Sequence, residues 1–220
     1  MKVGTDGVLL GAWTSLAHDP TSILDIGTGT GVIALMLAQR SSAELIDALE
    51  IDEDAYEQAV ENFENSDWGD RLFCYHAAFD EFVEEIEGET YDLIVSNPPF
   101  YSDDYSSNDA RRDQARFAEA LPFPELLEGV ARLLSEEGRF SVVIPRGEEE
   151  AFLKLAEHYG LFPQRITRVK GNPEVPEKRS LLELGFQQLE VEPSALVIET
   201  TRHSYTPEYI ALTRDFYLKM

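Results

Sequence analysis

The chain alternates short aliphatic runs with segments of helical periodicity, and this alternation restricts its fold more than any other feature. β-branched and aliphatic residues gather in the runs, whereas apolar residues recur every three or four positions in the segments between them. The predicted strands span residues 22–26, 45–51, 71–76, 91–96, 139–144, 164–169 and 180–187, and the predicted helices span residues 31–40, 54–64, 124–134, 148–159 and 207–217. A strand, a helix and a second strand form a parallel βαβ unit. The sequence therefore predicts an α/β fold with a mostly parallel, doubly wound sheet and helices on both faces.

The length and composition are typical of one ordinary domain. A chain of 220 residues with 43% hydrophobic content can bury a sizeable core, so we expect a single domain across residues 1–220. No apolar run reaches the length of a membrane span, and the first residues lack a signal peptide's apolar region, so we expect a soluble, cytoplasmic protein. The one cysteine, Cys74, is expected to pack within a strand. The four histidines lack metal-ligand spacing, so we expect no metal site.

The charge is unusually negative and unevenly distributed. The chain has a net charge of −24, with 24 acidic and 3 basic residues in residues 1–110 but 18 acidic and 15 basic residues in residues 111–220. Acidic surfaces repel phosphate, so any nucleic acid is expected to approach the second half. Lysine is scarce beside arginine, 5 against 13. We therefore hypothesise a salty, halophile-like cytosol, in which charges are screened within about 3 Å near 1 M salt.

A glycine-rich turn follows the first predicted strand and leads directly into a helix. The turn reads DIGTGTG over residues 25–31, and Glu50 ends the next strand about twenty residues later. Glycines permit a tight turn and close approach of a ligand to the backbone, and a strand-end carboxylate can accept hydrogen bonds from a ribose. Asp25 beside the turn suits an amino group better than a pyrophosphate. The pattern indicates a nucleoside-containing cofactor, with a purely structural glycine turn as the alternative.

A second motif, SNPPF over residues 96–100, follows the fourth predicted strand, where open α/β sheets bind their ligands. The Asn97 side-chain oxygen and the Pro98 carbonyl can each accept one N–H of a planar amine, which localises the nitrogen lone pair. Pro98 and Pro99 fix the backbone that aims these acceptors, and Phe100 offers a face for stacking worth roughly 1–3 kcal/mol. An isolated Asn-Pro-Pro is more often a rigid turn, but its position here favours an amino-methylating site that needs no metal.

With both motifs in place, the sequence resembles the class I S-adenosylmethionine-dependent methyltransferases, which have a Rossmann-like fold. Within this class it is similar to the bacterial tRNA1(Val) (adenine(37)-N(6))-methyltransferase family. The resemblance covers nearly the whole chain and rests on the opening Lys2–Trp13, the glycine turn, Asn97–Phe100 and the ending Tyr209–Met220. It implies a seven-stranded sheet with its last strand antiparallel, and methylation of adenosine 37 beside the anticodon of a valine tRNA. Family members usually carry an additional segment before the positions that match Lys2, and we expect this segment to be missing before residue 1.

The resemblance also assigns roles to individual residues. It implies that Asp25, Gly27, Thr28, Gly29 and Gly31 hold the methionine part of S-adenosylmethionine, that Thr5 and Asp6 close over this part, that Glu50 holds the ribose and that Ala78 and Phe79 hold the adenine. Asn97, Pro98, Pro99 and Phe100 would hold the target base. Arg111, Arg112 and Arg116 are candidates for RNA phosphates, although a solvated charged helix is an equal interpretation.

Other functions remain open at this point. Asn-Pro-Pro sites serve several planar amines, so the substrate could instead be a protein glutamine amide or a guanine amine. A non-catalytic, RNA-associated protein that binds the cofactor is a further alternative. A nicotinamide dehydrogenase is the weakest alternative, because no acid–base pair supports it.

Overall fold

The computed structural model describes residues 4–86, 88–99 and 121–218. Eight strands form the main sheet in the order β3-β2-β1-β4-β5-β7-β6-β8. They are β1 (Ser22–Ile26), β2 (Leu45–Glu50), β3 (Leu72–His76), β4 (Tyr91–Ser96), β5 (Leu134–Pro145), β6 (Phe162–Lys170), β7 (Arg179–Gly185) and β8 (Ser194–Val197). Strands β3, β2, β1, β4 and β5 are parallel neighbours, as the βαβ alternation predicts.

The expected strand count was wrong by one. Seven strands lie at the expected places, and β7 is antiparallel to both β5 and β6. The additional strand β8 pairs in parallel with β6, through Thr167 opposite Ser194 and Lys170 opposite Val197. Strand β8 has only four residues, and two of their side chains are exposed, so its sequence shows little strand pattern. It forms a strand because it pairs with β6. A separate hairpin of β9 (Glu199–Thr201) and β10 (Ser204–Tyr205) follows it.

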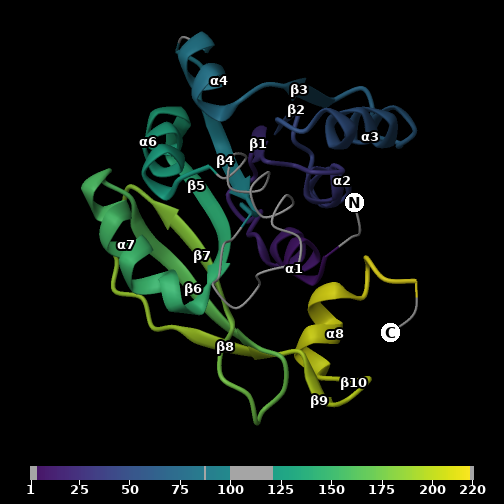
Figure 1. The fold of residues 1–220 in the computed structure, drawn as a ribbon, viewed down its shortest axis with the longest axis vertical. Coiled ribbons are helices and arrows are strands. Elements are labelled where there is room, and N and C mark those ends of the chain that lie inside the picture. Colours follow the sequence, from purple (N-terminus) through teal and green to yellow (C-terminus); the bar gives the residue numbers. More distant parts are fainter. Residues whose placement is uncertain (1–3, 87, 100–120, 219–220) are drawn as a thin grey trace, which may run out of the picture.

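Helices cover both faces of the sheet, as expected (Figure 1). One face carries α1 (Thr5–Trp13), α2 (Val32–Arg40), α3 (Glu53–Glu64) and α8 (Pro207–Thr213), and the other carries α4 (Phe79–Glu85), α6 (Phe123–Leu133) and α7 (Glu149–His158), which follows the 3-10 turn η2 (Arg146–Glu148). The last helix ends at Thr213 rather than near Tyr217. None of the helices in the described ranges is long and apolar enough to cross a membrane.

Two apolar clusters separate the sheet from its helical layers. Leu24, Ile94 and Phe140 pack against α4, α6 and α7, whereas Ile23, Ile46 and Leu93 pack against α1, α2 and α3. Neighbouring residues of one strand point to opposite faces, so Ile23 and Leu24 enter different clusters. The clusters hold the strands rigidly, and the loops at the carboxyl ends of β1, β2 and β4 project from this fixed frame.

Candidate functional site

The predicted cofactor and base-binding motifs converge at one edge of the sheet. Strand β1 lies between β2 and β4, and Ile26 is paired with Leu49 on one side and with Ser96 on the other. Gly27, Glu50 and Asn97 each follow directly on these paired residues. Because the three strands are parallel, their carboxyl ends meet here, at the reversal of strand order where open α/β sheets bind ligands.

The glycine turn needs its glycines. Gly27, Gly29 and Gly31 have φ angles of 69°, 60° and 81°, which other residues rarely adopt. Gly31 also approaches α3 so closely that a Cβ atom would lie 2.4 Å from Cε1 of Phe63. The turn is closed by hydrogen bonds from Thr28 N to Leu49 O, at 2.9 Å, and from Gly31 N to Thr28 O, at 3.1 Å. The turn therefore has a fixed shape before any ligand arrives.

Asp25 lies beneath this turn, fully buried. Its Oδ2 atom accepts hydrogen bonds from Thr28 Oγ1 at 2.6 Å and from Ala34 N at 3.2 Å. Its Oδ1 atom has no hydrogen-bond partner among the described residues. Burial raises the pKa of Asp25 to about 7, against hydrogen bonds that lower it, and the negative charge of Glu50 adds to the rise. An ammonium group would satisfy the free oxygen and neutralise the charge.

The Glu50 carboxylate is held by backbone N–H groups. Oε2 accepts from Gly29 N at 2.7 Å, and Oε1 accepts from Ile51 N and Asp52 N, each at 2.9 Å. A carboxylate offers about four acceptor positions, so three occupied positions leave one for a ribose hydroxyl. Glu50 thus orders the glycine turn as well as the expected ribose site, a second role that the sequence pattern did not indicate.

Asn97 is half-buried directly after β4, whose end is fixed by a hydrogen bond from Ser96 Oγ to Ile26 O at 2.9 Å. Pro98 is buried and Pro99 is exposed. Helix α1 passes close to the asparagine, because a Cβ atom on Gly7 would lie 3.8 Å from Asn97 Nδ2. Phe100 and the three arginines Arg111, Arg112 and Arg116 lie outside the described residues.

The first helix holds Thr5 and Asp6 near this edge, but Asp6 already has a partner. Its Oδ2 atom accepts from Arg179 Nε at 2.8 Å, which ties α1 to the start of β7. The structure therefore places the Asp6 carboxylate in an ion pair, whereas Thr5 is exposed. Contact of either residue with the methionine end stays a prediction.

The expected adenine contacts are divided between surface and core. Ala78 is half-buried before α4, but the Phe79 ring is buried against α6, where a Cβ atom on Gly129 would lie 2.3 Å from its Cε1 atom. Phe79 can therefore offer an adenine its backbone but not its ring. Ile51, which follows Glu50 directly and is 48% exposed, offers apolar surface beside the expected ribose site that the sequence pattern did not indicate. The sequence could have indicated Ile51, because an aliphatic residue stands there in the turn directly after the strand-end acid Glu50.

Several arginines of the second half are paired with carboxylates. Arg168 Nη2 contacts Glu149 Oε1 at 2.7 Å, Arg165 Nη2 contacts Glu183 Oε2 at 3.0 Å and Arg146 Nε contacts Glu177 Oε2 at 3.1 Å. Lys170 ends β6 and Lys178 precedes β7, at the same edge of the sheet as Asn97. Within the described part of the chain, no group of three or more histidine, cysteine or acidic side chains could hold a metal ion.

Comparisons with known proteins agree with this geometry. The family model described as "Methyltransferase small domain" matches residues 8–164. A solved structure of a predicted O-methyltransferase, protein Atu636 from Agrobacterium tumefaciens, superposes with a TM-score of 0.73 at 19% identity, covering 96% of both chains, which shows the shared fold. The fold and the matched model define the chain as a member of the methyltransferase small domain family.

The sequence relatives narrow this class. The tRNA1(Val) (adenine(37)-N6)-methyltransferase of Christiangramia forsetii is 64% identical over 100% of this chain and 92% of its own length. That of Flavobacterium psychrophilum is 65% identical over 100% of this chain and 94% of its own length. The chain belongs to the family of tRNA1(Val) (adenine(37)-N6)-methyltransferases.

Proposed function

We propose that this protein transfers a methyl group from S-adenosylmethionine to the exocyclic amine of adenosine 37 in a valine tRNA, in the cytoplasm. The observation that carries the proposal is the position of Asn97, at the end of β4 and beside the glycine turn that follows β1. The full-length relatives named for this reaction support the choice of substrate.

The cofactor pocket fits S-adenosylmethionine through three features. The free Oδ1 atom of buried Asp25 can meet the ammonium group of the methionine part, and the remaining acceptor position on Glu50 can take one ribose hydroxyl. The exposed side chain of Ile51 and the half-buried Ala78 offer apolar surface for the adenine. When bound, S-adenosylmethionine supplies an electrophilic methyl group on a sulfonium ion.

The chain's own residues prepare the amine. The Asn97 side-chain oxygen and the Pro98 carbonyl accept its two N–H groups, hold the nitrogen in one orientation and localise its lone pair. Helix α1 passes beside Asn97 at Gly7 and covers part of the amide. The nitrogen gains the methyl group as the carbon–sulfur bond breaks, and it then loses one proton to solvent. The base must leave its stack to reach this pocket, which is cheapest in a single-stranded loop.

The tRNA is expected to approach the less acidic second half, where Lys170 and Lys178 lie at the same edge of the sheet as Asn97. The predicted phosphate contacts of Arg111, Arg112 and Arg116 would add to this surface. Each phosphate contact contributes about 0.7 to 0.9 to the slope of log affinity against log salt concentration. Charge-neutral variants of Lys170 and Lys178 should therefore lower both tRNA affinity and this slope.

The test combines labelled S-adenosylmethionine, unmodified total tRNA, and mass spectrometry of the methylated nucleoside, at low and at molar salt. Asn97→Ala should abolish turnover while the cofactor dissociation constant changes by no more than about twofold, because the amide faces the base. The matched variant Asn65→Ala, at the exposed end of α3, should retain activity. Methylation of a guanine or of a protein amide, with adenosine 37 unlabelled, would overturn the proposed substrate.

A further inference from the structure

Strand β3 forms an open edge of the main sheet. It stands first in the strand order and pairs only with β2 among the described strands. Ile46 N donates to Arg71 O at 2.8 Å, so the backbone groups of residues 71, 73 and 75 face β2. Backbone groups of successive strand residues alternate in direction. The N–H and C=O groups of Leu72, Cys74 and His76 therefore point away from the sheet, towards the open edge.

This edge lacks the features that usually protect an exposed strand. Natural edges carry lysine, proline or a bulge that prevents pairing with another chain. Strand β3 (LFCYH) has no lysine or proline, and its register with β2 shows no bulge. Instead, Phe73 and Tyr75 are 44% and 42% exposed, and by strand alternation they share one face. The edge thus offers both free backbone groups and apolar side chains.

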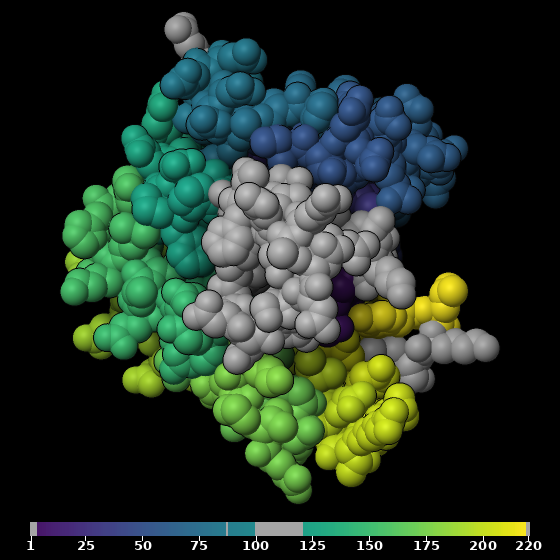
Figure 2. Space-filling view, viewed as in Figure 1, coloured from purple at the N-terminus to yellow at the C-terminus, as the bar shows by residue number. Residues whose placement is uncertain are grey.

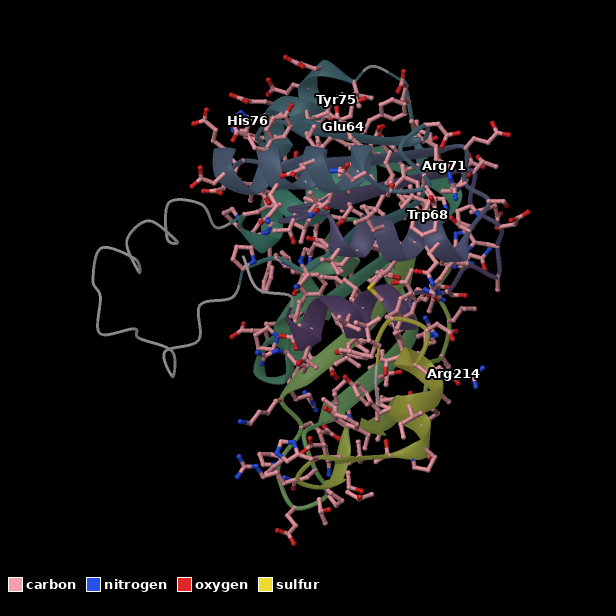
Figure 3. The ribbon with its side chains drawn as sticks, turned by 90° about the vertical axis from the view of Figure 1, so that its right-hand side faces the viewer. Glu64, Trp68, Arg71, Tyr75, His76 and Arg214 are labelled. Carbon is pink, nitrogen blue, oxygen red and sulfur yellow. The ribbon has the colours of Figure 1, made fainter. Side chains whose placement is uncertain are left out.

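The opposite face of β3 borders an open cavity of about 350 Å³, between the strand and α3. Tyr56, Val60 and Glu64 line it from the helix, and residues 72–75 line it from the strand, so the cavity reaches the open edge. Figure 3 shows Glu64, Tyr75 and His76 at one end of the molecule, with Trp68 and Arg71 nearby. A strand added to β3 would have room on this side for every second side chain.

The charge around this edge determines what can occupy it. Residues 51–90 contain 14 acidic residues and one basic residue, Arg71. The Arg71 guanidinium donates to the carbonyls of Ala38 and Ala43, at 2.7 and 2.6 Å, at the end of α2. Residues 51–90, coloured blue, form one end of the molecule in Figure 2, with α6 beside them and the light-green and yellow residues at the opposite end.

A second copy of this chain is a poor occupant, because pairing two β3 edges would bring two acidic ends together. The acidity is also not uniform, since residues 111–220 carry nearly balanced charge. A general adaptation to salt would not concentrate the acidic residues in residues 51–90. The complementary occupant is positively charged.

We propose that β3 and the adjoining cavity bind an extended segment of another protein, in which basic and aliphatic residues alternate, by addition of a strand to the sheet. Its backbone would pair with the free groups of Leu72, Cys74 and His76. Its aliphatic side chains would cover Phe73 and Tyr75. Its lysines would extend along Tyr56 and Val60, with their charged ends at the acids of α3. This inference does not depend on the proposed methyl transfer.

A peptide of about nine residues that alternates lysine and valine serves as the probe. We expect binding, and slowed hydrogen exchange at the N–H groups of Leu72, Cys74 and His76. The N–H groups of Phe73 and Tyr75 already face β2 and should change much less, which gives an internal control. A peptide that alternates glutamate and valine has the same strand propensity and should bind at least roughly tenfold more weakly.

Two variants separate the site from general electrostatics. Glu64→Lys should weaken binding of the basic peptide by roughly fivefold or more, whereas the matched Glu157→Lys, exposed on α7, should leave it unchanged. Phe73→Ser should weaken binding without loss of the circular dichroism spectrum. Absence of binding at millimolar peptide, equal binding of the acidic peptide, or equal loss in both lysine variants would overturn the proposal. Concentration-dependent protection of β3 without peptide would assign the edge to a second copy instead.

Discussion

Asp25→Asn should change how the free energy of unfolding depends on pH. The folded protein holds the Asp25 carboxyl with a pKa of about 7, against 3.8 for an ordinary aspartate, because the side chain is buried. The unfolded chain therefore loses this proton at lower pH than the folded protein does. As the pH rises from about 4 to about 7, Asp25 makes folding progressively less favourable.

The size of the effect follows from the shift. About three pKa units at 1.36 kcal/mol each give roughly 4 kcal/mol at pH 8 as an upper bound. Asparagine has nearly the same shape, keeps an acceptor for Thr28 Oγ1 and does not titrate. Asp25→Asn should therefore be more stable than the parent at pH 8, by roughly 2–4 kcal/mol, and nearly equal to it near pH 4.

Urea denaturation of both proteins, without cofactor, at several pH values from 4 to 8 measures this difference. Subtracting the two curves removes the contributions of all other groups, including Asp92 and Glu149, whose pKa values are lowered. The exposed Asp54→Asn serves as the control and should follow the parent. Parallel curves for the parent and Asp25→Asn would refute the reasoning. The same variant should bind S-adenosylmethionine at least tenfold more weakly, since the amide carries no charge for the ammonium group.

Three further predictions concern the frame around the site. Gly31→Ala should lower the free energy of unfolding by about 2 kcal/mol or more, because of the φ of 81° and the approach of Phe63, and urea denaturation will show it. Phe79→Ala should cost about 3–5 kcal/mol of stability but leave the cofactor affinity of the folded fraction within about twofold, as calorimetry at low temperature can test. Burial acts to raise the pKa of Glu149, but hydrogen bonds from Arg168 and Ser180 hold it below its usual value. Its contribution to stability is therefore present above pH 4.5 and is lost as the pH falls below that value, so Glu149→Gln should destabilise the protein at pH 7 and much less at pH 3, by thermal unfolding.

The sequence alone determined the order and type of most elements. Predicted strands 22–26 and 91–96 coincide with β1 and β4, because aliphatic runs that are buried on both faces leave little choice of structure. It also placed the glycine turn, Glu50 and Asn97 at the ends of parallel strands, and therefore at one edge. The short helix α4 and the strand β8 were not predicted, because α4 spans only about two helical turns and two of the four side chains of β8 are exposed.

Only the tertiary structure decided how these residues are used. The Asp6 carboxylate pairs with Arg179, 173 residues away, and the Phe79 ring packs against Gly129 on α6. The backbone N–H groups around Glu50 occupy most of its acceptor positions, and the free Oδ1 of Asp25 arises from complete burial. The local sequence pattern shows which face of a helix or strand is apolar, but it does not show which residue from a distant part of the chain packs against that face. Contacts between residues far apart in the chain depend on how the layers pack, so the tertiary structure alone determines them.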